Sequence, residues 1–310
     1  MVDVRGYDAA SSVRAAEPIG ARLAELPCPT IARISGPEAA GATPSAAGVV
    51  DAFDVVVSSD EALGEVLTAI ERTPLAAMAL VQLLRHSARL TIHDALIAES
   101  LVYSTLQAGP EFGAWLSSRS GRPAPAAAGG PAVVVERDGA CMNLTLNRPE
   151  THNAFSAEMR DALVEALRVV VSDASVERVV VRGRGTSFCS GGYLDEFGSL
   201  PDPTTAHAVR STRNAGRLLA ACADRVRVNV HGACIGAGIE LPAFAGRVVA
   251  SPDAYFVLPE VAMGLVPGAG GTASIARRIG RQRTAAMALT GARVDARTAL
   301  AWGLIDEIAA

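Results

Sequence analysis

Two segments in the second half of the chain each join a strand-like run directly to a glycine-rich turn. ERVVVRG (177–183) is followed by FCSGGYLDEF (188–197), and RVRVNVHG (225–232) leads into ACIGAGIEL (233–241). Runs of branched apolar residues are typical of buried strands, and glycine permits a tight turn before a helix. Strand–turn–helix units that repeat predict a layered α/β or α+β domain, in which helices cover the sheet faces.

One break in composition divides the chain. Residues 120–132 are rich in Pro, Gly and Ala, which is typical of a linker. We therefore expect a weakly patterned segment over 1–53, a helical segment over 54–119, the linker, and a core over 133–310. The helical segment predicts four helices with strong apolar periodicity and no polar cluster. In the core, Asp138-Gly139 marks a hairpin turn and Ser156 is placed to cap a helix.

Charge and residue usage exclude several classes of function. The formal net charge is −4 and no basic tract occurs, which argues against a nucleic-acid partner. All 28 basic residues are arginine, so a Schiff-base lysine, a pyridoxal-phosphate anchor and a P-loop lysine are all absent. Five scattered cysteines predict reduced thiols in a cytoplasmic protein and imply no metal site. No signal peptide is expected, and the longest apolar stretch is too short to span a membrane.

Two glutamates stand alone among apolar residues, Glu240 after the second glycine-rich turn and Glu260 twenty residues later. Burial of a carboxylate is costly, so such positions call for a chemical reason. Two strand-to-helix turns are able to present one N–H each to the same oxygen. An oxyanion hole beside a carboxylate pair is suited to enolate chemistry on a thioester. Each glycine-rich turn alone is equally consistent with a tight turn and a helix cap.

The motifs LNRPETHNAF, GRGTSFCSGG, HGACIGAGIEL, LPEVAMGLVPGAGGT and ALTGARVDARTALAWGLIDEI occur in this order. With them, the region Val133–Ile308 resembles the crotonase, or enoyl-CoA hydratase/isomerase, superfamily. The resemblance implies a spiral of ββα units assembled as a homo-oligomer, either a trimer or a pair of trimers. It also implies acyl-CoA substrates, with coenzyme A as part of the substrate and no further cofactor.

The roles of the family carry over onto individual positions. The resemblance makes Gly192 and Ala237 the oxyanion N–H donors and Glu240 and Glu260 the catalytic carboxylates. In hydratases these carboxylates hold a water and add it across the 2,3-double bond of an enoyl-CoA. The remaining matched positions line the acyl pocket or lie near the CoA arm: Ala154, Ser190, Tyr193 and Gly268.

Two positions depart from the family pattern. Tyr193 stands where the family usually has an aspartate that caps the next helix, so its side chain is expected to project into the acyl pocket. Pro242 follows Glu240 by two residues and is expected to delay or distort that helix. The leading hypothesis is an enoyl-CoA hydratase. The alternatives are an isomerase or other acyl-CoA enolate chemistry on the same scaffold, and a non-catalytic acyl-CoA-binding homologue.

The covering helices that family members carry after GLIDEI do not follow it here, since the sequence given ends at Ala310. The front segment 54–119 resembles those helices, including a TPLA start and a GPEF ending. LPCPTIARISG (26–36) resembles a worn copy of the strand before the second glycine-rich turn. We therefore expect a permuted or partly duplicated crotonase whose covering helices precede its core. The alternative is an unrelated helical appendage.

Overall fold

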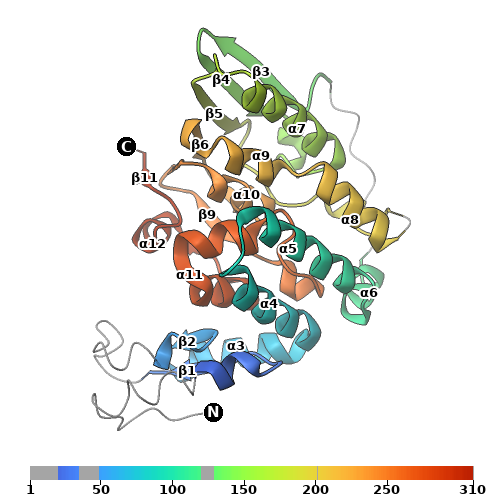
Figure 1. Cartoon of the computed structure of the whole chain (residues 1–310), viewed down its shortest axis with the longest axis vertical. Coiled ribbons are helices and arrows are strands. Elements are labelled where there is room, and N and C mark those ends of the chain that lie inside the picture. Colours follow the sequence, from blue (N-terminus) through green and yellow to red (C-terminus); the bar gives the residue numbers. More distant parts are fainter. Residues whose placement is uncertain (1–19, 35–48, 120–128, 201, 310) are drawn as a thin grey trace.

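The computed structural model describes residues 20–34, 49–119, 129–200 and 202–309. Parts of the expected 1–53 segment and most of the expected 120–132 linker lie outside these described residues. The described chain is mixed helix and sheet, and the strand over 31–33 and the hairpin over 133–146 lie at opposite ends of its long axis (Figure 1).

The main sheet has six strands in the order β11-β8-β6-β5-β4-β3. The β3–β4 pair is the antiparallel hairpin that Asp138-Gly139 predicted, and the other neighbouring strands run parallel. Residues on β5 and β6 alternate between buried and more exposed positions, and all three valines of β6 are buried. The bounds are β3 Val133–Asp138, β4 Cys141–Leu146, β5 Arg178–Gly183, β6 Val226–Val230, β8 Arg247–Ala250 and β11 Glu307–Ile308.

A second sheet of three short strands has the order β10-β9-β7. The chain alternates between the two sheets, because β6 and β8 belong to the first and β7 and β9 to the second. This alternation produces the repeated strand–strand–helix units that the family resemblance implies. The short strands are β7 Ala233–Ile235, β9 Tyr255–Val257 and β10 Val294–Asp295.

Helices cover these sheets and begin at the caps that the sequence supplies. The Ser156 hydroxyl accepts from the Met159 N–H at 3.1 Å and so caps α7 as expected. The long helix α11 is interrupted at Gly280, whose φ of 80° is not helical. The helices of this part are α7 Ala157–Ser172, α8 Pro203–Thr212, α9 Ala215–Ala221, α10 Ala237–Glu240, α11 Gly271–Thr290 and α12 Ala296–Trp302.

The front segment forms the four predicted helices, and α4 and α5 pack on α11 (Figure 1). Leu80 and Leu96 on these helices share one hydrophobic core with Ile239 next to Glu240. The Glu111 carboxylate accepts from the Leu75 N–H at 2.7 Å, so α6 closes back on the start of α4. The bounds are α3 Asp60–Arg72, α4 Pro74–Ser87, α5 Ile92–Gln107 and α6 Pro110–Ser117.

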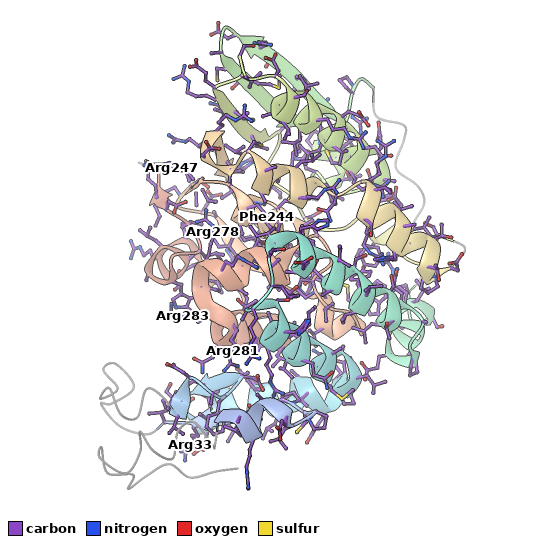
Figure 2. All side chains as sticks on the ribbon, viewed as in Figure 1. Arg33, Phe244, Arg247, Arg278, Arg281 and Arg283 are labelled. Carbon is purple, nitrogen blue, oxygen red and sulfur yellow. The ribbon has the colours of Figure 1, made fainter. Side chains whose placement is uncertain are left out.

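A small N-terminal unit joins β1 (Ile31–Arg33) and β2 (Val55–Val57) in parallel. Its carboxylate Asp54, only 2% exposed, pairs with Arg85 on α4 and with Arg281 on α11. Figure 2 shows Arg281 between α11 and this unit. Charge pairing therefore ties the unit to the helices that cover the core.

No single helix in the described ranges is long and apolar enough to cross a membrane. The pair α3–α4 reaches the necessary length and composition only when taken together, and it is bent by 109°.

Candidate active site

The two glycine-rich turns lie against each other. The Cys189 N–H donates to the Ala233 carbonyl at 3.2 Å, and the Ile235 N–H donates to the Cys189 carbonyl at 3.0 Å. Gly238 makes this approach possible, because a Cβ atom there would lie 2.3 Å from the Cys189 oxygen. Backbone hydrogen bonds thus fix the two turns in register.

The predicted oxyanion donors Gly192 and Ala237 both line one pocket. Neither N–H donates a hydrogen bond to any partner within the described part of the chain. Ala237 is the first residue of α10, where a helical N–H has no intrahelical acceptor. The turns therefore leave two free donors facing the same space, which suits a developing oxyanion.

This pocket has a volume of about 410 Å³ and brings most of the predicted site residues together. The predicted residues on its wall are Gly192, Tyr193, Ala237, Glu240, Glu260 and Gly268. Ala154 and Ser190 do not line it. Ala154 is buried. Ser190 lies on the first glycine-rich segment, and its hydroxyl donates to the Thr151 carbonyl at 3.3 Å.

Glu240 projects from the short helix α10 and is 2% exposed. Its Oε2 accepts from the Ala269 and Gly271 N–H groups, both at 2.8 Å. Burial raises the pKa of Glu240 to about 7, although these two hydrogen bonds favour the ionised form. The carboxyl is therefore poised to exchange a proton near neutral pH.

Glu260 opens the 3-10 turn η6 (Glu260–Met263) and is 9% exposed. Its buried Oε2 has no hydrogen-bond partner among the described residues. Burial, reinforced by Glu240, raises the pKa of Glu260 well above its usual value. Two N–H groups therefore favour the ionised form of Glu240, whereas Glu260 Oε2 has no such donor among the described residues.

The two carboxyl groups converge beside Gly236. A Cβ atom on Gly236 would lie 2.4 Å from Glu260 Oε1 and 3.7 Å from Glu240 Oε1. Only glycine fits here, since its φ of 49° is also unfavourable for other residues. The turn that presents the Ala237 N–H thus also leaves room for both glutamates.

The structure shows where Pro242 and Tyr193, the two positions that depart from the family pattern, lie. The helix begins at Ala237, so Pro242 does not delay it, and the expected late start is wrong. The helix instead ends after four residues, and Pro242 starts the 3-10 turn η5 (Pro242–Phe244). Tyr193 lines the pocket as expected and makes no side-chain cap.

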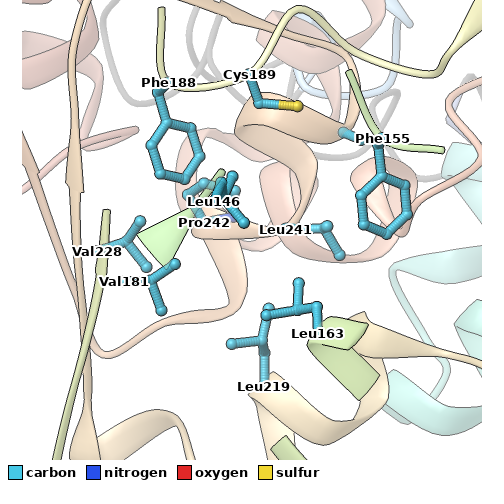
Figure 3. A pocket seen from close by; sticks show the side chains of 11 residues that line it. Leu146, Phe155, Leu163, Val181, Phe188, Cys189, Leu219, Val228, Leu241 and Pro242 are labelled. Atoms are coloured by element: carbon cyan, nitrogen blue, oxygen red, sulfur yellow. The ribbon is translucent and has the colours of Figure 1, made fainter. Parts of the chain in front are cut away.

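Pro242 contributes to a second, smaller cavity of about 20 Å³ (Figure 3), which Ala237 also lines. Its wall is apolar apart from the Cys189 thiol and contains no carboxyl group. A space of this size holds about one water, but a water there lacks polar partners. The chemistry therefore belongs to the larger pocket.

A third buried carboxylate, Glu99 on the front helix α5, does not line the pocket but binds the turn that also holds Glu240. Its Oε1 accepts from the Gly270 N–H at 2.7 Å, and its Oε2 accepts from the Thr272 N–H at 2.9 Å. The expectation that the front helices hold no polar cluster is wrong, because Ser100, Tyr103 and Ser104 join Glu99 on α5 as buried polar residues. In the sequence, Glu99 stands as one charge among apolar residues, which is the same pattern that pointed to Glu240.

The front helices cover the pocket of their own chain. Tyr103 and Gln107 of α5 line it. A Cβ atom on Gly268 would lie 2.4 Å from the Tyr103 ring, so glycine there lets the ring pack against the backbone. Residues from the front segment and the core therefore build one site together.

The sequence of this chain is similar to known proteins. A sequence profile described as enoyl-CoA hydratase/isomerase matches residues 136–310. The 2,3-dehydroadipyl-CoA hydratase of Escherichia coli is 32% identical over 176 residues, which cover 57% of this chain and 68% of that protein. The 1,2-epoxyphenylacetyl-CoA isomerase of the same organism is 35% identical over 171 residues, which cover 54% and 65%. The chain thus spans about two thirds of the length of these relatives.

Solved structures agree with the profile. The enoyl-CoA hydratase of Mycobacterium smegmatis is 33% identical, and its match has a TM-score of 0.54 over 58% of this chain and 71% of that one. The crotonase-like α/β fold predicted from the sequence is therefore confirmed. The chain belongs to the enoyl-CoA hydratase/isomerase family.

Proposed function

We propose that this protein hydrates enoyl-CoA thioesters, adding water across the 2,3-double bond. The observation that carries the proposal is the convergence of the Glu240 and Glu260 carboxyl groups beside Gly236, in a pocket that also exposes two free N–H groups. Coenzyme A enters as part of the substrate, and no further cofactor takes part. Relatives with printed hydratase names support the reaction class.

The pKa values support distinct roles for the two glutamates. Glu240 receives two N–H groups and has a pKa of about 7, so its ionised form serves as the base. It takes a proton from water as the water oxygen bonds to C3. The Gly192 and Ala237 N–H groups hold the enolate oxygen, a contribution of about 3 kcal/mol per donor. Glu260, whose pKa is raised by burial and by the neighbouring Glu240, donates its proton to C2.

The test is the hydration of a series of enoyl-CoA chain lengths, followed by chromatographic detection of 3-hydroxyacyl-CoA. We expect product from the wild type and at least a hundredfold loss of kcat in Glu240→Gln and in Glu260→Gln, measured separately. Glu165→Gln, which changes an exposed glutamate on α7, is the matched control. Absence of 3-hydroxyacyl-CoA with every chain length would refute the proposal.

Isomerisation of the double bond is the second candidate, and a relative from Mycosarcoma maydis that is named an enoyl-CoA isomerase/hydratase favours it. A double-bond shift needs one group to move a proton, so activity that survives one of the two substitutions would indicate an isomerase. Binding of CoA esters without any turnover would indicate a non-catalytic homologue.

Assembly and location form a separate part of the proposal. We propose a homo-oligomer, a trimer or a pair of trimers, in the cytoplasm, with no nucleic-acid or membrane partner. Light scattering of the purified protein tests the oligomeric state.

A further inference from the structure

Part of the pocket wall is polar. Gln107 from α5, Arg160 from α7 and Arg210 from α8 line it together with Val209. The reacting thioester belongs beside Gly192 and the glutamates, and under the proposed function the acyl group extends from there along Tyr103, which contacts both Gly268 and Arg210. A purely apolar acyl chain would leave these polar groups desolvated without a partner.

Arg210 is held firmly, and all its partners are neutral. Its Nε donates to the Ser100 hydroxyl at 3.1 Å and its Nη1 to Gln107 Oε1 at 3.2 Å. Its Nη2 donates to the Ser104 hydroxyl and to the Ser100 carbonyl. The guanidinium also lies 4.5 Å from the centre of the Tyr103 ring, which orients it further.

Arg210 lacks a direct acidic partner among the described residues, although Glu99 acts on it electrostatically from α5. Arg160, the other arginine of the pocket, pairs with Asp161 at 2.9 Å. Arg210 forms no ion pair with an acidic group within the described ranges. A guanidinium has five N–H donors, and the four hydrogen bonds leave one N–H on Nη1 uncommitted. Arg210 is half-buried, so this charge and donor are available to a ligand in a partly desolvated place.

We propose that the pocket selects enoyl-CoA thioesters that carry a carboxylate at the far end of the acyl chain, with Arg210 as the residue that recognises it. The inference rests on the proposed function, because the pose of the thioester follows from it. A carboxylate supplies the direct acidic partner and accepts the free N–H of Arg210 in one charge-assisted contact. Gln107, already bonded to Nη1, holds the guanidinium in place for that contact.

The experiment compares each ω-carboxy-enoyl-CoA with its methyl ester, which has nearly the same shape and no charge. We expect the wild type to show a kcat/KM at least about tenfold higher for the acid than for the ester. Arg210→Gln should remove this preference, and Arg210→Lys should retain part of it, because a lysine keeps the charge without the planar fork. Arg217→Gln, an exposed arginine on α9, should leave it intact.

Arg210 also links α5 to α8, so its substitution is able to lower activity by loosening the fold. The decisive quantity is therefore the ratio of kcat/KM for the acid to kcat/KM for the ester. A purely structural role, or a contact with the phosphates of coenzyme A, would weaken both substrates equally in Arg210→Gln. That result, or equal use of acid and ester by the wild type, would overturn the proposal. Thermal melting of each variant shows whether it is folded.

Calorimetric binding of the matching saturated acyl-CoA pair separates this inference from the proposed function. If no enoyl-CoA is turned over but the acid binds at least about tenfold more tightly than its ester, hydration is refuted and recognition by Arg210 stands. If hydration occurs without preference in either measurement, recognition alone is refuted.

Discussion

Glu99 and Glu240 accept hydrogen bonds from alternate N–H groups of one turn. Ala269 and Gly271 donate to Glu240, and Gly270 and Thr272 donate to Glu99. The turn leads into α11, so its N–H groups would otherwise lack partners. One carboxyl comes from the core and the other from the front helices, and the two interact electrostatically through this shared turn.

The buried carboxyl of Glu99 makes stability depend on pH. Burial, with Glu240 as the next cause, raises its pKa from 4.5 to about 8. The folded state then binds the proton more tightly than the unfolded state, so this stabilisation is complete below pH 4.5 and is lost as pH rises toward 8. The difference in the free energy of unfolding between Glu99→Gln and wild type should therefore shift in favour of the variant by a few kcal/mol from pH 5 to pH 8. Urea unfolding at both values measures this difference, and a change of opposite sign would contradict it.

Glu99 should also affect the alkaline side of the activity profile. Ionisation of Glu99 opposes ionisation of Glu260, the group proposed to donate the proton. Glu99→Gln removes that negative charge, so the pKa of Glu260 falls and the alkaline limb of kcat/KM moves to lower pH. The acid limb, set by Glu240, should stay in place because Glu99 is already neutral there. A profile from pH 5 to 9 measures both limbs; equal displacement of both would argue against this role.

The close approach of the two turns predicts a large effect of one methyl group at Gly238. A Cβ atom there would lie 2.3 Å from the Cys189 oxygen, which would push the Gly192 and Ala237 N–H groups apart. Gly238→Ala should lower kcat by about a hundredfold and destabilise the fold by about 1–3 kcal/mol. Gly64→Ala is the control, because nothing lies within 4 Å of a Cβ atom in that helix. It should stabilise slightly, and a similar loss in both variants would count against the explanation.

The N-terminal unit should depend on Asp54 for its attachment. Asp54→Asn leaves Arg85 and Arg281 without their buried counter-ion, which should cost about 3–5 kcal/mol. Proteolysis should then cleave near β2 sooner than in the wild type. Asp60→Asn breaks the exposed pair with Arg33 and should change stability by less than about 1 kcal/mol. Unchanged unfolding of Asp54→Asn would show that apolar packing alone holds the unit.

Local patterns predicted much of the fold and the site. Glu240 and Glu260 were identified because each is one charge among apolar residues, and the helix over 157–172 because Ser156 precedes a periodic run. The strands β7, β9 and β10 were not predicted, because two or three residues are too few to show a period. Their backbone partners lie far away in sequence.

Glu99 shows the limit of this approach most clearly. Its partners on the α11 turn are 171 and 173 residues away, and no local spacing relates them. The periodicity of the surrounding helix also accounts for its apolar neighbours without any reference to the site. That the hydrogen-bond partners of Arg210 are all neutral is likewise visible only once α5 and α8 are packed together.

The position of the covering helices ahead of the core has a consequence for biosynthesis. Glu99 leaves the ribosome 171 residues before Gly270, the first N–H donor to its carboxyl. At about 5–20 residues per second, this interval lasts roughly 10 to 30 s. During that time the apolar faces of α4 and α5 have no α11 to pack against. Translation speed through the core and access to chaperones therefore bear directly on the yield of folded protein.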